Sequence, residues 1–197
     1  MPTVDQILPQ TIVAENPYTT QPKSLSKNCV KQEERTSLTP RIEILLERFP
    51  TFKSFLEYNN PSRQFEIVKH PYKYLFGNSP TLSEVNIAYQ NNECSNIWLI
   101  PQIADATLSC GLKEDATKEQ FQTVAMGISV FYHWLKIDEL MMFFFGFKLG
   151  RYERFYSRFD TQIFMGSISL YLKKRNEAID HAIKIGISLN DSNEQEK

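Results

Sequence analysis

The segment IDELMMFFFGFKLG, residues 137–150, constrains the fold of this chain more than any other. Its middle turns are apolar on every side, and a helix with this pattern has to be buried around most of its circumference. Asp138 and Glu139 stand near its start, where carboxylates complement the positive end of the helix dipole, and Gly150 closes it. The segment predicts a central helix over residues 137–149, sandwiched between the helices before and after it.

Helix start and stop signals recur along residues 39–186. The Thr-Pro pair at 39–40 is typical of a helix start, and Pro50 should break that helix into two short pieces. Thr117 and Gln120 fit a capping box ahead of the clearest amphipathic stretch, which continues to about residue 135. Further helices are expected over residues 84–90 with Ser83 as the cap and from the cap Asp160 to about residue 185. Another is expected over residues 96–110, where Pro101 should kink the helix or mark its first turns and Gly111 should end it.

The remaining segments carry weaker signals. Residues 61–80 show no clear period and predict a short strand or a packed loop. Residues 1–38 are rich in Pro, Thr, Gln, Ser and Asn, which is typical of a disordered or extended tail, and residues 187–197 form a polar tail. The expected fold is therefore mainly α, a single irregular helical bundle over residues 39–186 with a disordered N-terminal segment and a short C-terminal tail.

The charge of the chain is balanced overall and uneven locally. A net charge of −1 excludes a strongly basic coat or a strongly acidic tail as the dominant feature. From Lys148 to Arg175, however, seven Lys and Arg residues stand against two Asp and Glu residues, while 15 bases and 21 acids make up the rest. One end of the bundle is therefore expected to be electropositive.

Motifs for enzymatic chemistry are missing from the sequence. It has no GxxxxGK or GxGxxG phosphate loop, no GxSxG nucleophile turn and no HExxH metal motif. The three histidines fall on separate segments, and the three cysteines are too far apart for a disulfide framework or a metal site. We therefore expect no catalytic residue, no metal, no cofactor and no small-molecule substrate.

Targeting signals are also missing. The start, MPTVDQILPQ, has no basic region followed by an apolar run, so no signal peptide is expected. The richest apolar run, inside residues 137–150, is far shorter than a membrane span. We expect a cytoplasmic protein with no membrane partner.

The segment GRYERFYSRFD, residues 150–160, suggests a function. If it were helical, its arginines would lie on one stripe and its aromatic residues on the neighbouring stripe. Arginine forks bind phosphate oxygens and aromatic faces stack on bases, as in proteins that bind single strands. The residues expected to bind nucleic acid or a partner are Arg151, Tyr152, Arg154, Tyr156, Arg158, Lys173 and Lys174.

The same residues can also be explained by a purely structural role. The aromatic rings would fill the core, while the arginine stems cover it and some guanidiniums pair with Asp138 or Glu139. Arg175 falls on the apolar stripe of the last helix, and an arginine in such a position usually has a carboxylate partner. Arg175, Asp138 and Glu139 are therefore expected to form a structural ion pair.

Three segments, NIWLIPQIADATLSCG, LKIDELMMFFFGFKLGRYERFYSRFD and LYLKKRNEAID, carry a resemblance over about residues 80–183. They resemble a family of uncharacterised helical proteins from prophages and conjugative elements of gut anaerobic bacteria. That family typically has glycines where this chain has Glu153 and Ser157, and a proline in place of Thr161. If those glycines serve a loop with positive φ, a helix over this segment would be broken. The resemblance implies a setting of mobile DNA and names no catalytic residue.

These observations leave two leading function hypotheses, with an enzyme as the third. The first is a non-enzymatic accessory protein of a mobile element that binds nucleic acid, or a replication or transfer protein, through the basic and aromatic residues after position 150. The second is a protein-binding or self-assembling adaptor with no nucleic-acid contact.

Overall fold

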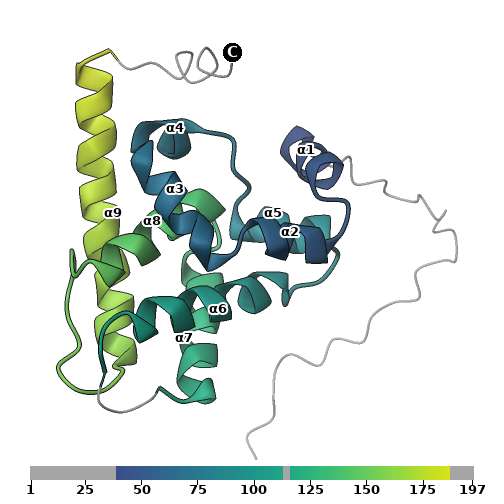
Figure 1. Ribbon diagram of the computed structural model, residues 1–197. Helices are drawn as coiled ribbons and strands as arrows, with labels where there is room; N and C mark the ends of the chain where they lie inside the picture. Colours follow the sequence, from purple (N-terminus) through teal and green to yellow (C-terminus); the bar gives the residue numbers. More distant parts are fainter. Residues whose placement is uncertain (1–38, 113–115, 187–197) are drawn as a thin grey trace, which may run out of the picture. The chain divides into compact units, whose positions relative to one another are not determined.

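The computed structural model describes residues 39–112 and 116–186, and within these residues it contains nine α-helices, one 3-10 helix and no strand (Figure 1). The prediction of a mainly α, irregular helical bundle is confirmed. The predicted tails, residues 1–38 and 187–197, lie outside the described residues. No helix in the described part of the chain is both long and apolar enough to cross a lipid bilayer.

The first two helices start and stop where the sequence indicates. Helix α1 (Pro40–Arg48) begins with proline at its first position, where a missing N–H costs nothing. After the break at Pro50, helix α2 (Phe52–Tyr58) begins with a capping box in which the backbone N–H of Ser54 donates to Thr51 Oγ1 over 3.1 Å.

The prediction of a strand or loop over residues 61–80 is wrong, because most of this segment is helical. It forms the 3-10 helix η1 (Pro61–Arg63), helix α3 (Gln64–Lys69) and helix α4 (Pro71–Phe76). Each piece spans fewer than two turns, too few to reveal a helical period in the sequence. A signal that could have identified them is proline at the first helical position of both η1 and α4.

Helix α5 (Leu82–Ala88) starts earlier than expected. Its cap is Thr81, whose Oγ1 accepts the backbone N–H of Glu84 over 3.2 Å, while Glu84 Oε2 accepts the N–H of Thr81 over 2.8 Å. Ser83 therefore lies inside the helix and does not cap it. Thr81 and Ser83 are both residues that can cap a helix. Thr81 is the cap because Glu84, three residues later, completes a capping box with it.

Helix α6 (Cys94–Leu108) contains Pro101 in its interior and not in its first turn. The chain reverses after α6 at Gly111, whose φ of +64° is the left-handed conformation expected of a glycine that follows a helix. Helix α7 (Lys118–Phe131) begins with the predicted capping box of Thr117 and Gln120, which is confirmed. It ends four residues earlier than the apolar pattern suggests.

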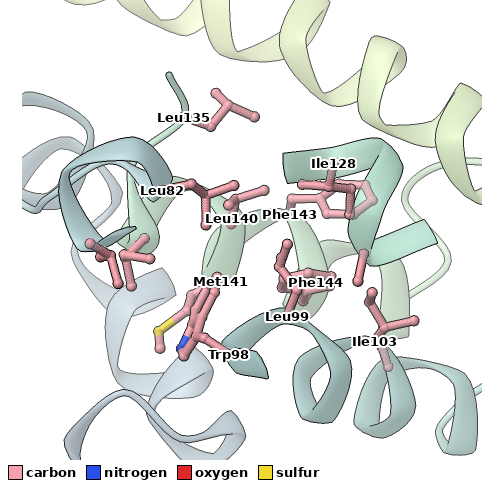
Figure 2. Packing of buried hydrophobic residues seen from close by; sticks show 14 of the residues in the cluster. Leu82, Trp98, Leu99, Ile103, Ile128, Leu135, Leu140, Met141, Phe143 and Phe144 are labelled. Carbon is pink, nitrogen blue, oxygen red and sulfur yellow. The ribbon is translucent and has the colours of Figure 1, made fainter. Parts of the chain in front are cut away.

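Helix α8 (Ile137–Lys148) is the buried helix that the sequence predicts. Figure 2 shows its Leu140, Met141, Phe143 and Phe144 among core side chains that include Trp98 of α6. It packs mainly against α3, α6, α4 and α9. Helix α7 packs chiefly against α6 and α9, and its buried Val124, Ala125 and Ile128 belong to the same core cluster as α8.

Backbone hydrogen bonds join two distant segments at the start of α8. The backbone N–H of Leu82 donates to Leu135 O over 3.1 Å, and that of Ile137 donates to Pro80 O over 2.9 Å. The start of α8 is therefore held against the start of α5. Helix α9 (Thr161–Lys184), yellow in Figure 1, runs beside α7 and α8.

Candidate nucleic-acid interface

The basic loop, residues 151–159, connects α8 to α9 and is not helical. The two-stripe helix considered for this segment is therefore wrong. Gly150 has a φ of +64° and ends α8, and Asp160 Oδ1 accepts the backbone N–H groups of Gln162 and Ile163 at the start of α9. These two local signals stop one helix and start the next, so the residues between them form a loop. Glu153 does not have positive φ, since Gln90 is the only such non-glycine residue in the described part of the chain.

Three of the four aromatic side chains in the basic loop anchor it to the core. The ring of Tyr152 stacks on Phe143 of α8 with centroids 5.5 Å apart, Phe155 is half-buried, and Phe159 is buried. Tyr156 is different, because 94% of its surface is exposed. The predicted row of stacking rings is thus reduced to one free ring, that of Tyr156.

Gly146 of α8 makes room for one of these anchors, Tyr152. A Cβ placed on Gly146 would lie 2.6 Å from the Tyr152 hydroxyl oxygen, closer than such atoms approach in proteins. Burial raises the pKa of Tyr152 to about 12, and the nearby Arg151 guanidinium opposes this shift. Tyr152 therefore positions the loop and is not available to stack on a base.

The three arginines of the basic loop are exposed: Arg151, Arg154 and Arg158. Within the described residues, none of them lies within ion-pair distance of a carboxylate. The Arg154 guanidinium lies against Gly150, where its Nε would be 2.9 Å from an added Cβ. The suggestion that these arginines pair with the carboxylates at the start of α8 is therefore not what the structure contains.

The predicted lysines of α9 fall into two groups. Lys174 Nζ donates to the backbone oxygen of Arg151 over 2.8 Å and lies 5.3 Å from the centre of the Tyr152 ring. It therefore holds the start of the basic loop against α9, although its charge stays at the surface. Lys173 is exposed on the same helix.

The other two bases between positions 148 and 175 are bound by acids. Lys148 forms an ion pair with Asp105 of α6. Arg175 Nε donates to Glu139 Oε1 over 2.6 Å, and the Glu139 side chain is only 1% exposed. This ion pair between α8 and α9 was expected from the position of Arg175 on an apolar stripe.

Asp138 has a different partner from its neighbour. Arg63 Nη1 donates to Asp138 Oδ1 over 3.1 Å and to Asn59 Oδ1 over 2.6 Å. Burial raises the pKa of Asp138, and the Arg63 guanidinium opposes that shift. The predicted three-residue group is thus two separate pairs, because adjacent helical residues point about 100° apart. The sequence contained no signal for Arg63, which lies 75 positions away from its partner.

The possible metal ligands of the described residues are their His, Cys, Asp and Glu side chains, and Cys94 and Cys110 are free thiols. Among the described residues no three His, Cys, Asp or Glu side chains gather as metal ligands. Burial raises the pKa of the free thiols of Cys94 and Cys110, which makes both poor nucleophiles.

Comparison with known protein families identifies a similarity over part of the chain. Residues 117–185 are similar to a family of unknown function, DUF6633. This range contains α7, α8, the basic loop and α9, together with the pair of Glu139 and Arg175. No curated protein and no solved structure matches the chain.

Proposed function

We propose that this protein is a non-enzymatic accessory protein that binds nucleic acid, or a protein that handles it, through the basic loop. The observation that carries the proposal is that Arg151, Arg154 and Arg158 are exposed in the same loop as the free ring of Tyr156 and have no carboxylate partner within the described residues. Exposed Lys173 extends the positive charge onto α9.

Single-stranded nucleic acid fits this surface best. Guanidiniums fork onto phosphate oxygens, and an exposed ring stacks on a base that has no pairing partner. One stacked ring contributes about 1–3 kcal/mol and discriminates little between bases. Since the whole chain carries a net charge of −1, attraction is local to the basic loop and is expected to be weak at high salt.

The biological setting is part of the same proposal. The resemblance of residues 80–183 to proteins of prophages and conjugative elements supports a role beside mobile DNA in a bacterial cytoplasm. In that setting the partner is a transferred or replicating strand, or a replication or transfer protein bound to it.

Fluorescence anisotropy with labelled single-stranded DNA, single-stranded RNA and duplex DNA tests the proposal at two salt concentrations. Wild-type protein is expected to bind the single strands at low salt and to release them as salt rises. The variant Arg151→Ala/Arg154→Ala/Arg158→Ala should bind at least about tenfold more weakly.

A control variant loses the same number of positive charges at positions outside the basic loop. Lys53→Ala/Lys69→Ala/Lys118→Ala also removes three exposed positive charges, all outside the basic loop. It should bind like the wild type. Equal weakening of both variants, or no binding of any probe at low salt, would exclude the basic loop as a nucleic-acid interface.

A protein-binding or self-assembling adaptor is the second candidate, and one observation favours it. The end of α7 and the turn after it expose the apolar side chains of Met126, Val130, Phe131 and Trp134. Size-exclusion chromatography with light scattering tests this candidate. A species larger than a monomer that dissociates on Phe131→Ser supports it, and a monomer at high protein concentration contradicts self-assembly.

A further inference from the structure

A second concave surface lies apart from the basic loop. It is a cleft of about 600 Å³ bordered by α1, α2 and the segment 77–80 that leads to α5. This volume is within the range of pockets that hold small ligands, about 300–1,000 Å³. No residue of the basic loop lines the cleft.

The cleft is lined by an excess of positive charge. Arg41, Arg48, Arg63 and Lys73 line it, and Asp138 is the one carboxylate among its described lining residues. Asp138 is already bound by Arg63, and Arg41 Nη1 forms an ion pair with Glu84 Oε1 of α5 over 3.5 Å. A cleft of this composition attracts an anion and disfavours a cation.

Two of these guanidiniums are positioned by an aromatic ring as well as by hydrogen bonds. The guanidinium carbon of Arg48 lies 4.6 Å from the centre of the Tyr58 ring, and that of Arg63 lies 4.4 Å from it. Arg48 Nη2 also donates to the Tyr58 hydroxyl over 2.6 Å. Both charges are therefore held at one wall of the cleft before any ligand arrives, which reduces the entropy lost on binding.

Donors remain on both arginines. An arginine has five N–H groups, and within the described residues Arg48 uses one on Tyr58. Arg63 uses Nη1 on Asn59 and Asp138, which leaves its Nη2 and Nε for another acceptor. Forked donors of this kind match the oxygens of a phosphate group.

The lining of the cleft also contains apolar surface. Ile44 of α1 is exposed, and the rings of Tyr74 and Phe76 are partly buried in the lining. A flat apolar group attached to a phosphate would pack on these side chains while its anion reaches the arginines.

We propose that this cleft binds a small phosphate-bearing molecule of the nucleoside monophosphate class, with the phosphate on Arg48 and Arg63 and the base against Tyr74 and Phe76. This site is independent of the proposed interface at the basic loop, and neither depends on the other.

Isothermal titration calorimetry of the full chain with AMP, adenosine and inorganic phosphate, at constant ionic strength, tests the ligand class. AMP is expected to bind with a Kd below about 1 mM, phosphate more weakly, and adenosine not measurably. Equal affinity for phosphate and AMP would overturn the role of the aromatic wall. A lack of saturable binding by both anions would overturn the site.

Variants locate the binding. Ile44→Glu places a negative charge at an exposed position in the cleft and should weaken AMP binding at least about tenfold, whereas Ile44→Gln, which removes apolar contact without adding charge, should weaken it clearly less. Arg48→Gln should weaken it to a similar extent. Arg158→Gln, in the basic loop, should leave AMP binding unchanged. Wild-type affinity in the Ile44→Glu variant, with circular dichroism unchanged, would contradict the proposal.

Discussion

Arg175 of α9 donates a hydrogen bond to the buried carboxylate of Glu139 in α8 over 2.6 Å, and this contact ties the last helix to the central one. The guanidinium carbon of Arg175 also lies 5.8 Å from the centre of the Trp134 ring. The pair fixes the two helices on either side of the basic loop. The position of the loop therefore depends on a charge pair outside it.

Removing one partner of this pair should destabilise the fold strongly. Arg175→Met leaves Glu139 buried and unpaired, which costs about 3–5 kcal/mol of unfolding free energy. The double variant Arg175→Met/Glu139→Leu leaves no buried charge and should be more stable than Arg175→Met alone. Urea denaturation followed by circular dichroism measures both.

An exposed pair provides the control for this experiment. Lys53 Nζ and Glu57 Oε1 are 3.8 Å apart on α2, and both side chains are mostly exposed. Lys53→Met should change the unfolding free energy by less than about 1 kcal/mol. Equal effects of Lys53→Met and Arg175→Met would mean that the pair of Arg175 and Glu139 is not buried in solution.

The pH dependence of the unfolding free energy should show the effect of the raised pKa of Asp138. Burial raises its folded-state pKa above the ordinary value of 3.8, so the folded state binds this proton more tightly than the unfolded state. The stability that Asp138 contributes is fully present below pH 3.8 and is lost as the pH rises through the folded-state pKa. Asp138→Asn does not titrate. The unfolding free energy of the wild type minus that of Asp138→Asn should therefore fall with rising pH, and a rise would indicate that Arg63 outweighs burial.

Gly146→Ala should displace the basic loop, because the new methyl group would overlap the Tyr152 hydroxyl. We expect a loss of about 1–3 kcal/mol. The pKa of Tyr152 should fall from about 12 toward 10.0, the ordinary tyrosine value, as its ring moves into water. Ultraviolet absorbance during alkaline titration reports this change.

Gly166→Ala in α9 is the matched control, since nothing lies within 4 Å of a Cβ added there. It should leave the pKa of Tyr152 unchanged and stabilise the helix by about 0.5–1 kcal/mol. An unchanged Tyr152 titration in Gly146→Ala would show that the loop tolerates the methyl group.

Local signals made much of the fold predictable. The all-round apolar pattern after Glu139 indicated a buried helix, and Thr117, Gly150 and Asp160 fixed helix ends through their own backbone chemistry. The short helices within residues 61–80 were not predictable, because pieces of fewer than two turns show no period.

The candidate site was less predictable than the fold. Glu139 as the partner of Arg175 could be anticipated, because an arginine on an apolar stripe needs a carboxylate. The assignment of Tyr152 to the core and of Tyr156 to the surface could not, since it depends on the path of a loop and not on a periodic pattern. The cleft at Arg48 and Arg63 is assembled from segments that meet only in the folded chain.

Alanine variants of Tyr156 and Phe155 should have different effects, one on single-strand binding and the other on the unfolding free energy. Tyr156→Ala removes an exposed ring and should leave the unfolding free energy within about 0.5 kcal/mol of wild type. It should weaken single-strand binding by about 1–3 kcal/mol, which anisotropy measures. Phe155→Ala removes a ring packed on Phe147 and should mainly destabilise the fold. Full binding by Tyr156→Ala would remove stacking from the proposed function.

The salt dependence of single-strand binding tests the proposed phosphate contacts most directly. Log Kobs is measured against log salt concentration for the wild type and for Arg151→Ala/Arg154→Ala/Arg158→Ala. If each arginine meets one phosphate, the slope should become shallower by about 0.7 per arginine, or roughly two in total. Parallel lines for the two proteins would contradict the claim that these three side chains contact phosphate.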